Sequence, residues 1–426
     1  MTQTLRRTPA AALPAVTPAV TPAVTPAVTP AVTPAATPAR LRRGPLLLMS
    51  AATGLAVAGN HFAQPLLEVI GRQLGLSTTM AALIVTAAQG GYALGLILLV
   101  PLGDLVERRR LSVGLLAATS VFLLVSAFAQ NGALLLAGTA LTALTSVAAQ
   151  VVVPYAATLA APGERGRVVG TVMTGLLLGG LLARTAAGTV SALGGWRTIY
   201  LLNAILVAAA AVLLRRFLPR LHTPLGLSYP ALLGSTLAMF RHEPLLRWRA
   251  GIGALSFAAF SVLWTALTFL LTGPPYGWHE AAVGALGLAG IAGALATPIA
   301  GRLADRGRVQ QVSGIAAALL TLSWPLIAAG TLSPVPLIAG VVLFTAAQQA
   351  LLNANQNVIY ALAPENRNRL NSALMTAFFL GGAAGPPLAS LAWTHAGWNG
   401  VSLLGGALSA AALTLWALER LRAKHH

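Results

Sequence analysis

Long apolar runs, each followed by a short polar or glycine-rich stretch, succeed one another from residue 45 to residue 418. An α-helix needs about 20 such residues to cross ~30 Å of hydrocarbon, and in lipid only a helix satisfies its backbone polar groups within one segment. We therefore predict an all-α membrane protein. Its twelve spans are expected at 45–70, 79–103, 110–129, 131–159, 167–191, 197–218, 246–272, 280–304, 309–329, 334–361, 369–393 and 396–418.

The order of the spans indicates two similar halves. A shift of 202 residues aligns 161–200 with the later repeat, and twelve of the forty positions are identical, including Gly195-Trp196 with Gly397-Trp398. Because six spans preserve orientation in the membrane, these are parallel repeats, which build transporters with a site near the midplane. The predicted parts are a tail (1–44), a six-helix bundle (45–218), a linker (219–245), a second bundle (246–418) and a C-terminus (419–426).

Composition supports a lipid environment. The chain is 56% hydrophobic and 8% charged, with a mean hydropathy of +0.77. Soluble domains carry roughly 25% charged residues. The net charge of +18 is scattered in small groups between apolar runs, so a nucleic-acid partner is not expected.

The positions of the basic residues predict the orientation of the chain. With both termini cytoplasmic, all but three of the 27 Lys and Arg residues fall on the cytoplasmic side; the exceptions are Arg72, Arg184 and Arg197. Such retention of positive charge is the rule for inner-membrane proteins. The tail repeats Pro-Ala-Val-Thr from Pro14, and proline at every fourth residue predicts a disordered segment. No continuous apolar core follows Arg6 and Arg7, so we do not read the tail as a signal peptide.

Two loops carry carboxylates and arginines between apolar runs. They read Asp104-Leu-Val-Glu-Arg-Arg-Arg110 and Gly301-Arg-Leu-Ala-Asp-Arg-Gly-Arg308. We expect a gating role for these charges, because ion pairs at an interface bias two nearly degenerate states; the alternative is that they only set topology. The predicted gating residues are Asp104, Arg108, Arg109, Asp305, Arg306 and Arg308.

These loops resemble the signature of the major facilitator superfamily, although Val100 and Glu107 replace the two glycines in the first copy. Further segments resemble the bacterial arabinose-efflux-permease-like and drug-efflux branch: Asn60–Leu66, Gln150–Pro154, Gly179–Thr185 and Asn355-Gln356. The resemblance implies the twelve-helix fold, alternating access and a cavity lined by spans 1, 4, 7 and 10. Gly180 stands where related antiporters carry proline, which weakens the antiport inference.

Polar residues within the spans are the candidate substrate contacts. Arg184 lies deep in the fifth span, where a charge costs at least about 2.5–3.5 kcal/mol, so it faces either a cavity or structural hydrogen-bond partners. His61 titrates near neutrality and either carries a coupling proton or packs as a neutral group. Trp264 offers an aromatic face. The resemblance adds four amides, for which helix packing is the alternative: Gln64, Gln150, Asn355 and Gln356.

The sequence therefore predicts a secondary transporter of a bacterial inner membrane, in which a monomer exports a small amphipathic or sugar-like compound in a proton-linked cycle. One alternative is uptake or exchange of an organic anion bound by Arg184, and another is a transporter-like receptor or scaffold. There is no phosphate-binding Gly-Lys-Ser/Thr loop, no nucleophile–base pattern and no metal-ligand spacing. We expect neither an enzyme nor a bound cofactor or metal.

Overall fold

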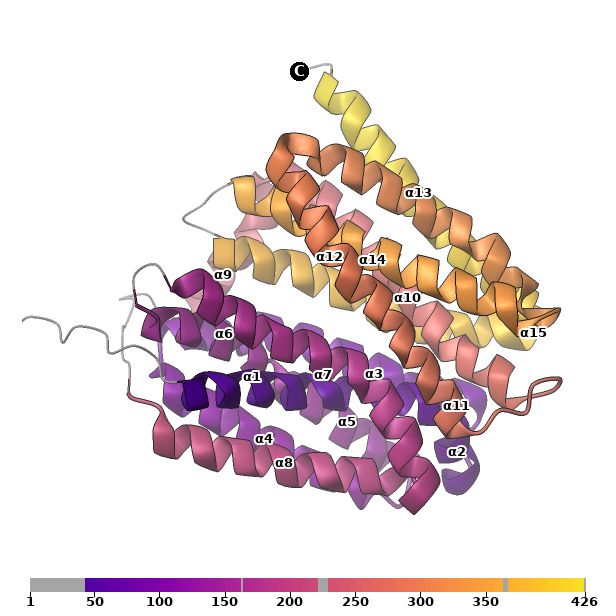
Figure 1. The fold of residues 1–426 in the computed structure, drawn as a ribbon, viewed down its shortest axis with the longest axis horizontal. Helices are drawn as coiled ribbons and strands as arrows, with labels where there is room; N and C mark the ends of the chain where they lie inside the picture. Colours follow the sequence, from indigo (N-terminus) through magenta and orange to yellow (C-terminus); the bar gives the residue numbers. More distant parts are fainter. Residues whose placement is uncertain (1–42, 162–163, 221–228, 363–366, 425–426) are drawn as a thin grey trace, which may run out of the picture. The chain divides into compact units, whose positions relative to one another are not determined.

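The computed structural model describes residues 43–161, 164–220, 229–362 and 367–424. The predicted tail lies outside the described residues except for Arg43 and Gly44, which begin the first helix. Throughout the described ranges the regular elements are helices, as Figure 1 shows.

Six spans precede the central connection and six follow it. The first six are formed by α1 (Arg43–Ala58) with η1 (Gly59–His61) and α2 (Ala63–Leu74), α3 (Thr78–Leu98), α4 (Arg108–Ala127), α5 (Gly132–Ser146) with α6 (Ala148–Leu159), α7 (Arg165–Gly194) and α8 (Trp196–Phe217). The connection contains α9 (Tyr229–His242). The last six are formed by α10 (Pro244–Thr272), α11 (Glu280–Ala285) with η3 (Leu286–Ala289) and α12 (Gly290–Leu303), α13 (Val309–Ala328), α14 (Pro334–Leu362) and the two parts of α15 (Arg367–Lys424).

The predicted number of spans is confirmed. Ten helical runs within the described ranges are long and apolar enough to cross a membrane, and α1–α2, bent by 45°, is an eleventh. The run Arg369–Arg422 holds two of the twelve, because Ala396 and Gly397 leave helical geometry in its middle. The last helix continues to Lys424, beyond the predicted end at residue 418.

Local sequence signals end and start these helices where the chain must reverse. Gly75 closes α2 in the left-handed conformation with φ of 65°, which glycine adopts at little cost. Ser77 and Asn131 cap α3 and α5 by accepting hydrogen bonds from Met80 N and Leu134 N. Gly195, with φ of 82°, separates α7 from α8.

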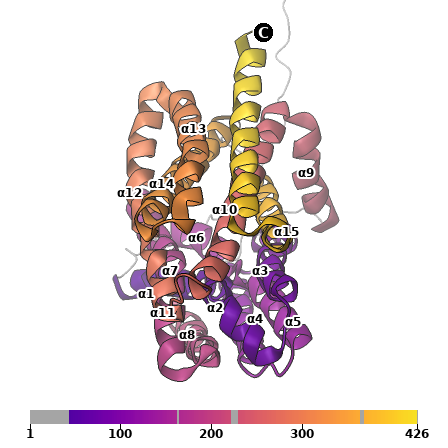
Figure 2. The same cartoon turned by 90° about the vertical axis from the view of Figure 1, so that its right-hand side faces the viewer.

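Each half has its own hydrophobic core. One core gathers buried residues from Leu46 to Leu218 with Phe269, and another gathers residues between Ile252 and Ala412. In Figure 2, α4, α5 and α8 lie together in one half, and α12, α13 and α14 lie together in the other. We call the end of the spans that holds Arg108, Tyr229 and Arg308 the basic end, and the other the opposite end.

Glycines let helices approach within a half. A Cβ on Gly175 would lie 2.0 Å from the carbonyl oxygen of Ser50, and one on Gly179 would lie 2.2 Å from that of Gly54. In the second half a Cβ on Gly381 would lie 2.1 Å from the carbonyl oxygen of Ala254. Any side chain at these positions would strike backbone, so spans 5 and 11 pack closely against the first span of their own half.

Candidate functional site

Arg184 is buried where the two halves meet. It projects from α7 with 7% of its surface exposed, and its Nε donates to Oε1 of Gln64 at 2.6 Å. Its Nη2 lies 3.3 Å from Nδ1 of His61. The bend between α1 and α2 brings His61 and Gln64 to this position, so the first half supplies the polar contacts of the guanidinium.

The second half supplies aromatic faces. The guanidinium carbon of Arg184 lies 4.5 Å from the ring centroid of Trp264 and 5.4 Å from that of Phe260, both on α10. Cation–π contacts of this kind strengthen when the groups are shielded from water. Of the predicted substrate residues, the structure thus brings together Arg184, Gln64, His61 and Trp264, and we call these four with Phe260 the Arg184 cluster.

Further contacts join the halves between the Arg184 cluster and the opposite end. Thr268 donates to the carbonyl oxygen of Gln64 at 2.7 Å, and Thr185 donates to that of Gly284 at 3.0 Å. Helix α7 meets α11 closely, since a Cβ on Gly188 would lie 2.3 Å from the carbonyl oxygen of Glu280. These hydrogen bonds hold the halves in direct contact on that side of the cluster.

The other predicted amides lie away from Arg184. Gln150 donates to the Tyr92 hydroxyl at 3.2 Å. Gln356 donates to Asn371 at 3.4 Å and lies 3.8 Å from the sulfur of Met375. Asn355 is buried and accepts a hydrogen bond from Arg249, which gives it a structural partner.

Sequence reasoning missed a buried ion pair in the second half. Arg249, with 0% of its side chain exposed, donates to Oε1 of Glu419 at 2.6 Å, and Glu419 is 6% exposed. The same guanidinium also donates to Gln310 at 2.7 Å and Ser313 at 2.9 Å. In the sequence both charges stand at the ends of apolar runs, like ordinary loop charges; the only signal was Glu419, an isolated carboxylate beside basic residues.

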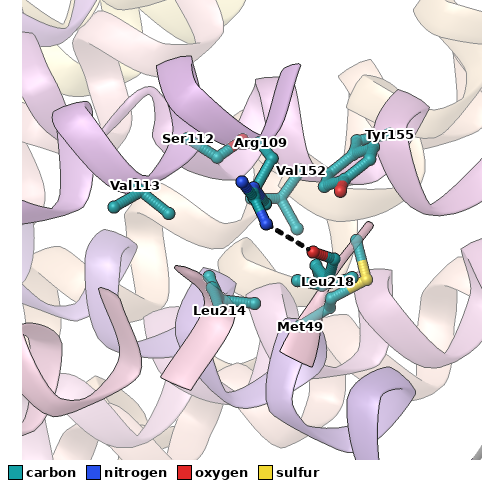
Figure 3. Close-up of a pocket in the computed structure, with 8 residues that line it drawn as sticks. All are labelled: Met49, Arg109, Ser112, Val113, Val152, Tyr155, Leu214 and Leu218. Carbon is teal, nitrogen blue, oxygen red and sulfur yellow. Dashed lines mark hydrogen bonds between the residues drawn. The ribbon is translucent and has the colours of Figure 1, made fainter. Parts of the chain in front are cut away.

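The basic loop of the first half contacts that same half. Arg108 donates to the carbonyl oxygens of Gly103 and Pro154 at 3.3 and 3.1 Å. Arg109 enters a small pocket with Met49 and Tyr155, where it donates to the carbonyl oxygen of Leu218 at 2.9 Å (Figure 3). It therefore caps the C-terminal end of α8.

The predicted gating carboxylates receive no structural account. The side chains of Asp104 and Asp305 lie outside the described part of the structure. Arg306 and Arg308 are exposed on η4 (Ala304–Arg308), where Gly307 turns the chain with φ of 75°. Within the described residues no group of three or more His, Cys, Asp or Glu side chains could hold a metal ion.

Twelve apolar helices in two six-span repeats, meeting around a buried cation, define a polytopic membrane transporter. The chain matches the sequence profile of the Major Facilitator Superfamily over residues 49–345 and 250–426, and it belongs to that family. It is 48% identical over 371 residues to the Escherichia coli transporter YgaY, covering 87% of this chain and 94% of that one. It is 26% identical over 355 residues to a protein of Streptomyces lividans named chloramphenicol resistance protein, covering 82% and 89%.

The fold has a close structural counterpart. A bacterial homologue of the human lysosomal transporter Spinster, crystallised in an inward-facing and occupied conformation, superposes with a TM-score of 0.71. The comparison covers 88% of this chain and 95% of the other, at 16% identity. The expected superfamily and fold are therefore confirmed, and the chain is a transporter rather than an enzyme.

Proposed function

We propose that this transporter exports a small amphipathic or sugar-like compound by alternating access, driven by the proton gradient. The observation that carries the proposal is Arg184, a cation from the first half held over Trp264 of the second. A cargo bound there touches both halves, so its binding energy biases their relative position. One chain supplies both halves of this site, which is why we propose a working monomer.

The orientation follows from charge. We place the basic end and both termini in the cytoplasm, in the inner membrane of a bacterium, because cationic loops are retained on that side. The contacts of Thr268 with Gln64 and of Thr185 with Gly284 then lie toward the outside. In this orientation the structure represents a state that is closed outward, from which the next step of export is separation of α7 from α11.

A relative supports the outward direction. The Streptomyces lividans protein is named for resistance to chloramphenicol, a small amphipathic compound, and removal from the cell is one route to resistance. His61 is our candidate for the coupling proton, because it is the titratable side chain in contact with Arg184. We propose that Asp104, Asp305, Arg306 and Arg308 gate the cytoplasmic side together with Arg108 and Arg109.

Uptake or exchange of an organic anion through the same cluster is the second candidate. The observation that favours it is that Arg184 has no carboxylate among its described hydrogen-bond and ion-pair partners. The two candidates differ in direction and share a binding site. Net movement of cargo out of cells or into them separates them, and any flux that depends on this chain argues against a receptor or scaffold.

The test uses cells that lack their own efflux pumps and a panel of amphipathic dyes, with and without a proton uncoupler. Wild type should lower dye accumulation, and the uncoupler, Asp104→Asn or Arg184→Ala should restore it. His61→Gln keeps a hydrogen-bond acceptor but cannot titrate, so export should lose its dependence on the proton gradient. Accumulation equal to that of empty cells across the panel, with uptake of labelled organic anions instead, would transfer support to the second candidate.

A further inference from the structure

The Arg184 cluster has an excess of positive charge. Among the described residues, the guanidinium contacts two uncharged polar side chains, Gln64 and His61, and two aromatic rings, Phe260 and Trp264. A buried charge is costly unless it is paired, and neutral partners only partly offset the loss of water. The cluster therefore carries one positive charge without a counter-charge, and one negative group on a ligand would neutralise it.

The orientation of Gln64 is fixed by chemistry. Arginine has only donors, so the atom facing Nε of Arg184 at 2.6 Å must be the amide oxygen. The amide nitrogen is then turned away, and this Nε2 is buried without a hydrogen-bond partner among the described residues. The Oε1 of Gln64 thus accepts from Arg184, and its Nε2 is left as a donor without an acceptor.

Trp264 presents a second unused donor. Its ring packs against Arg184, while its indole Nε1 is buried and also lacks a partner within the described part of the chain. An indole N–H can only donate. Buried polar groups are nearly always paired, so two orphaned donors on residues that touch one guanidinium point to a missing acceptor.

His61 completes the same pattern. Nδ1 accepts from Nη2 of Arg184, because the guanidinium cannot accept, so the neutral ring carries its proton on Nε2. His61 therefore adds a third N–H and no charge. The described partners of the guanidinium are thus all neutral, and the net charge of the cluster is that of Arg184 alone.

A row of aromatic rings extends from this cluster toward the basic end, and we call it the aromatic file: Trp264, Phe260, Phe257 and Phe378. The ring centroid of Trp264 lies 6.1 Å from that of Phe260, which lies 5.3 Å from Phe257. Phe257 stacks on Phe378 at 3.9 Å. Flat apolar groups pack well against such faces. The unpaired polar groups of the Arg184 cluster and this apolar aromatic surface therefore lie next to each other along α10.

We infer that the Arg184 cluster binds a carboxylate, and that the cargo is a monocarboxylate whose flat apolar body packs along the aromatic file from Trp264. The carboxylate accepts from Arg184, Gln64 Nε2 and Trp264 Nε1 and supplies the missing negative charge. This inference rests on the proposed transport function and names the chemical class of its substrate. It holds for either direction of transport, because both use the same site.

The experiment measures binding to the purified full-length protein in lipid nanodiscs, by thermal unfolding and calorimetry. The probes are 2-naphthoate, its uncharged analogue 2-naphthamide and the cation 2-naphthylmethylammonium, which share one ring system. Naphthoate should raise the unfolding temperature and bind at least about tenfold more tightly than the amide, the usual effect of one charge-assisted hydrogen bond. The cation should not bind.

Three variants locate the binding. Arg184→Gln should abolish the preference for naphthoate over naphthamide, and Trp264→Phe, which keeps a ring but loses the N–H, should weaken naphthoate about tenfold. Gln64→Glu places the chain's own carboxylate against Arg184, so naphthoate binding should disappear without a fall in unfolding temperature. The matched control is Arg197→Gln, which removes another arginine stacked on a tryptophan, away from the cluster. The guanidinium carbon of Arg197 lies 4.3 Å from the ring centroid of Trp196.

Equal binding of naphthoate and naphthamide to wild type would overturn the inference. So would unchanged naphthoate binding in Gln64→Glu, a variant expected to stay folded even if Arg184→Gln does not. These results are independent of transport. Selective naphthoate binding without export in cells would sink the export proposal alone, whereas dye export without selective anion binding would sink the carboxylate alone.

Discussion

Arg249 and Glu419 form a buried ion pair with 2.6 Å between Nη2 and Oε1, although 170 residues separate them in the chain. The pair joins the start of α10 to the end of α15. Because Arg249 also bonds Gln310 of α13 and Asn355 of α14, one guanidinium ties four of the six spans in this half. These contacts hold the helix ends of this half together at the basic end.

Removing one partner of this pair should be much worse than removing both. Arg249→Met or Glu419→Leu alone leaves an uncompensated buried charge, which typically costs about 3–5 kcal/mol. The double variant replaces the pair with apolar groups of similar size, so its stability should return to near that of wild type. Thermal unfolding in nanodiscs measures this, with the exposed Arg422→Gln as control. Additive losses in the double variant would show that the pair is not the coupled unit.

In the first half, a different arginine occupies the place that corresponds to Arg249. Gly179 packs against Gly54, and Gly381 packs in the same way against Ala254. A shift of 200 residues therefore aligns the first span of one half with that of the other, and Met49 corresponds to Arg249. The equivalent place in the first half is the pocket of Figure 3, which Arg109 enters from α4. There the guanidinium donates to the carbonyl end of α8, and the carboxylate of Glu107 lies 3.8 Å from its Nε.

Arg109 should therefore contribute to the stability of the first half. Arg109→Gln removes the hydrogen bonds to the carbonyl oxygens of Leu218 and Arg215, at 2.9 and 3.3 Å, and leaves the end of α8 uncapped. We expect a loss of about 1.5–3 kcal/mol, the usual value for hydrogen bonds that involve a charged group. The neighbouring Arg110 is exposed, so Arg110→Gln is the matched control. Equal unfolding temperatures for the two variants would argue against capping by Arg109.

Features that depend on adjacent residues could be predicted from the sequence, whereas contacts between residues far apart in the chain could not. Span positions depend on hydropathy over about 20 adjacent residues, so twelve spans could be predicted from the chain alone. The depth of Arg184 was visible for the same reason. Gln64 could be named as one of several amides able to bond it, but which side chains contact it could not be predicted. Gln64 and His61 lie 120 and 123 residues away, and the contact needs both the bend of the first span and its packing against α7. The identity of Gln64 as a candidate came from family resemblance.

Arg249 shows the converse failure. Its position beside Arg247 and Trp248, at the start of an apolar run, is typical of a cytoplasmic cation, and the count of retained charges treats it as one. Burial arises because α10, α13, α14 and α15 converge there, and hydropathy averaged along one helix carries no information about such convergence. The aromatic file along α10 was missed for the same reason.

Close contact between α1 and α7 should tolerate no side chain at Gly179. A Cβ there would lie 2.2 Å from the backbone of Gly54, so Gly179→Val must push two helices apart and should cost several kcal/mol or prevent folding. Gly170, on the same helix, has open space at its Cβ position, and Gly170→Val is the control. Yield and unfolding temperature of the purified variants check this. Normal folding of Gly179→Val would contradict the packing of α1 on α7.

Closure at the opposite end can be trapped chemically. Thr79 of α3 and Ser390 of α15 lie with 3.0 Å between their hydroxyl oxygens, in different halves, and the chain has no cysteine of its own. Thr79→Cys with Ser390→Cys should therefore form a disulfide under mild oxidation, visible as a mobility shift after cleavage of the central connection by an introduced protease site. Because alternating access requires these halves to separate there, oxidation should stop transport and a reductant should restore it.

The control for this trap is Thr119→Cys with Thr145→Cys, two residues of the first half on the packed helices α4 and α5, with 2.9 Å between their hydroxyl oxygens. A bond between them would not join the halves, so oxidation should leave transport unchanged. If oxidised Thr79→Cys/Ser390→Cys protein transported at the wild-type rate, the contact at the opposite end would have no part in the cycle. Loss of activity in the reduced form would show instead that the substitutions themselves do the damage. A reversible block confined to the inter-half pair is thus the outcome that ties the closed arrangement to transport.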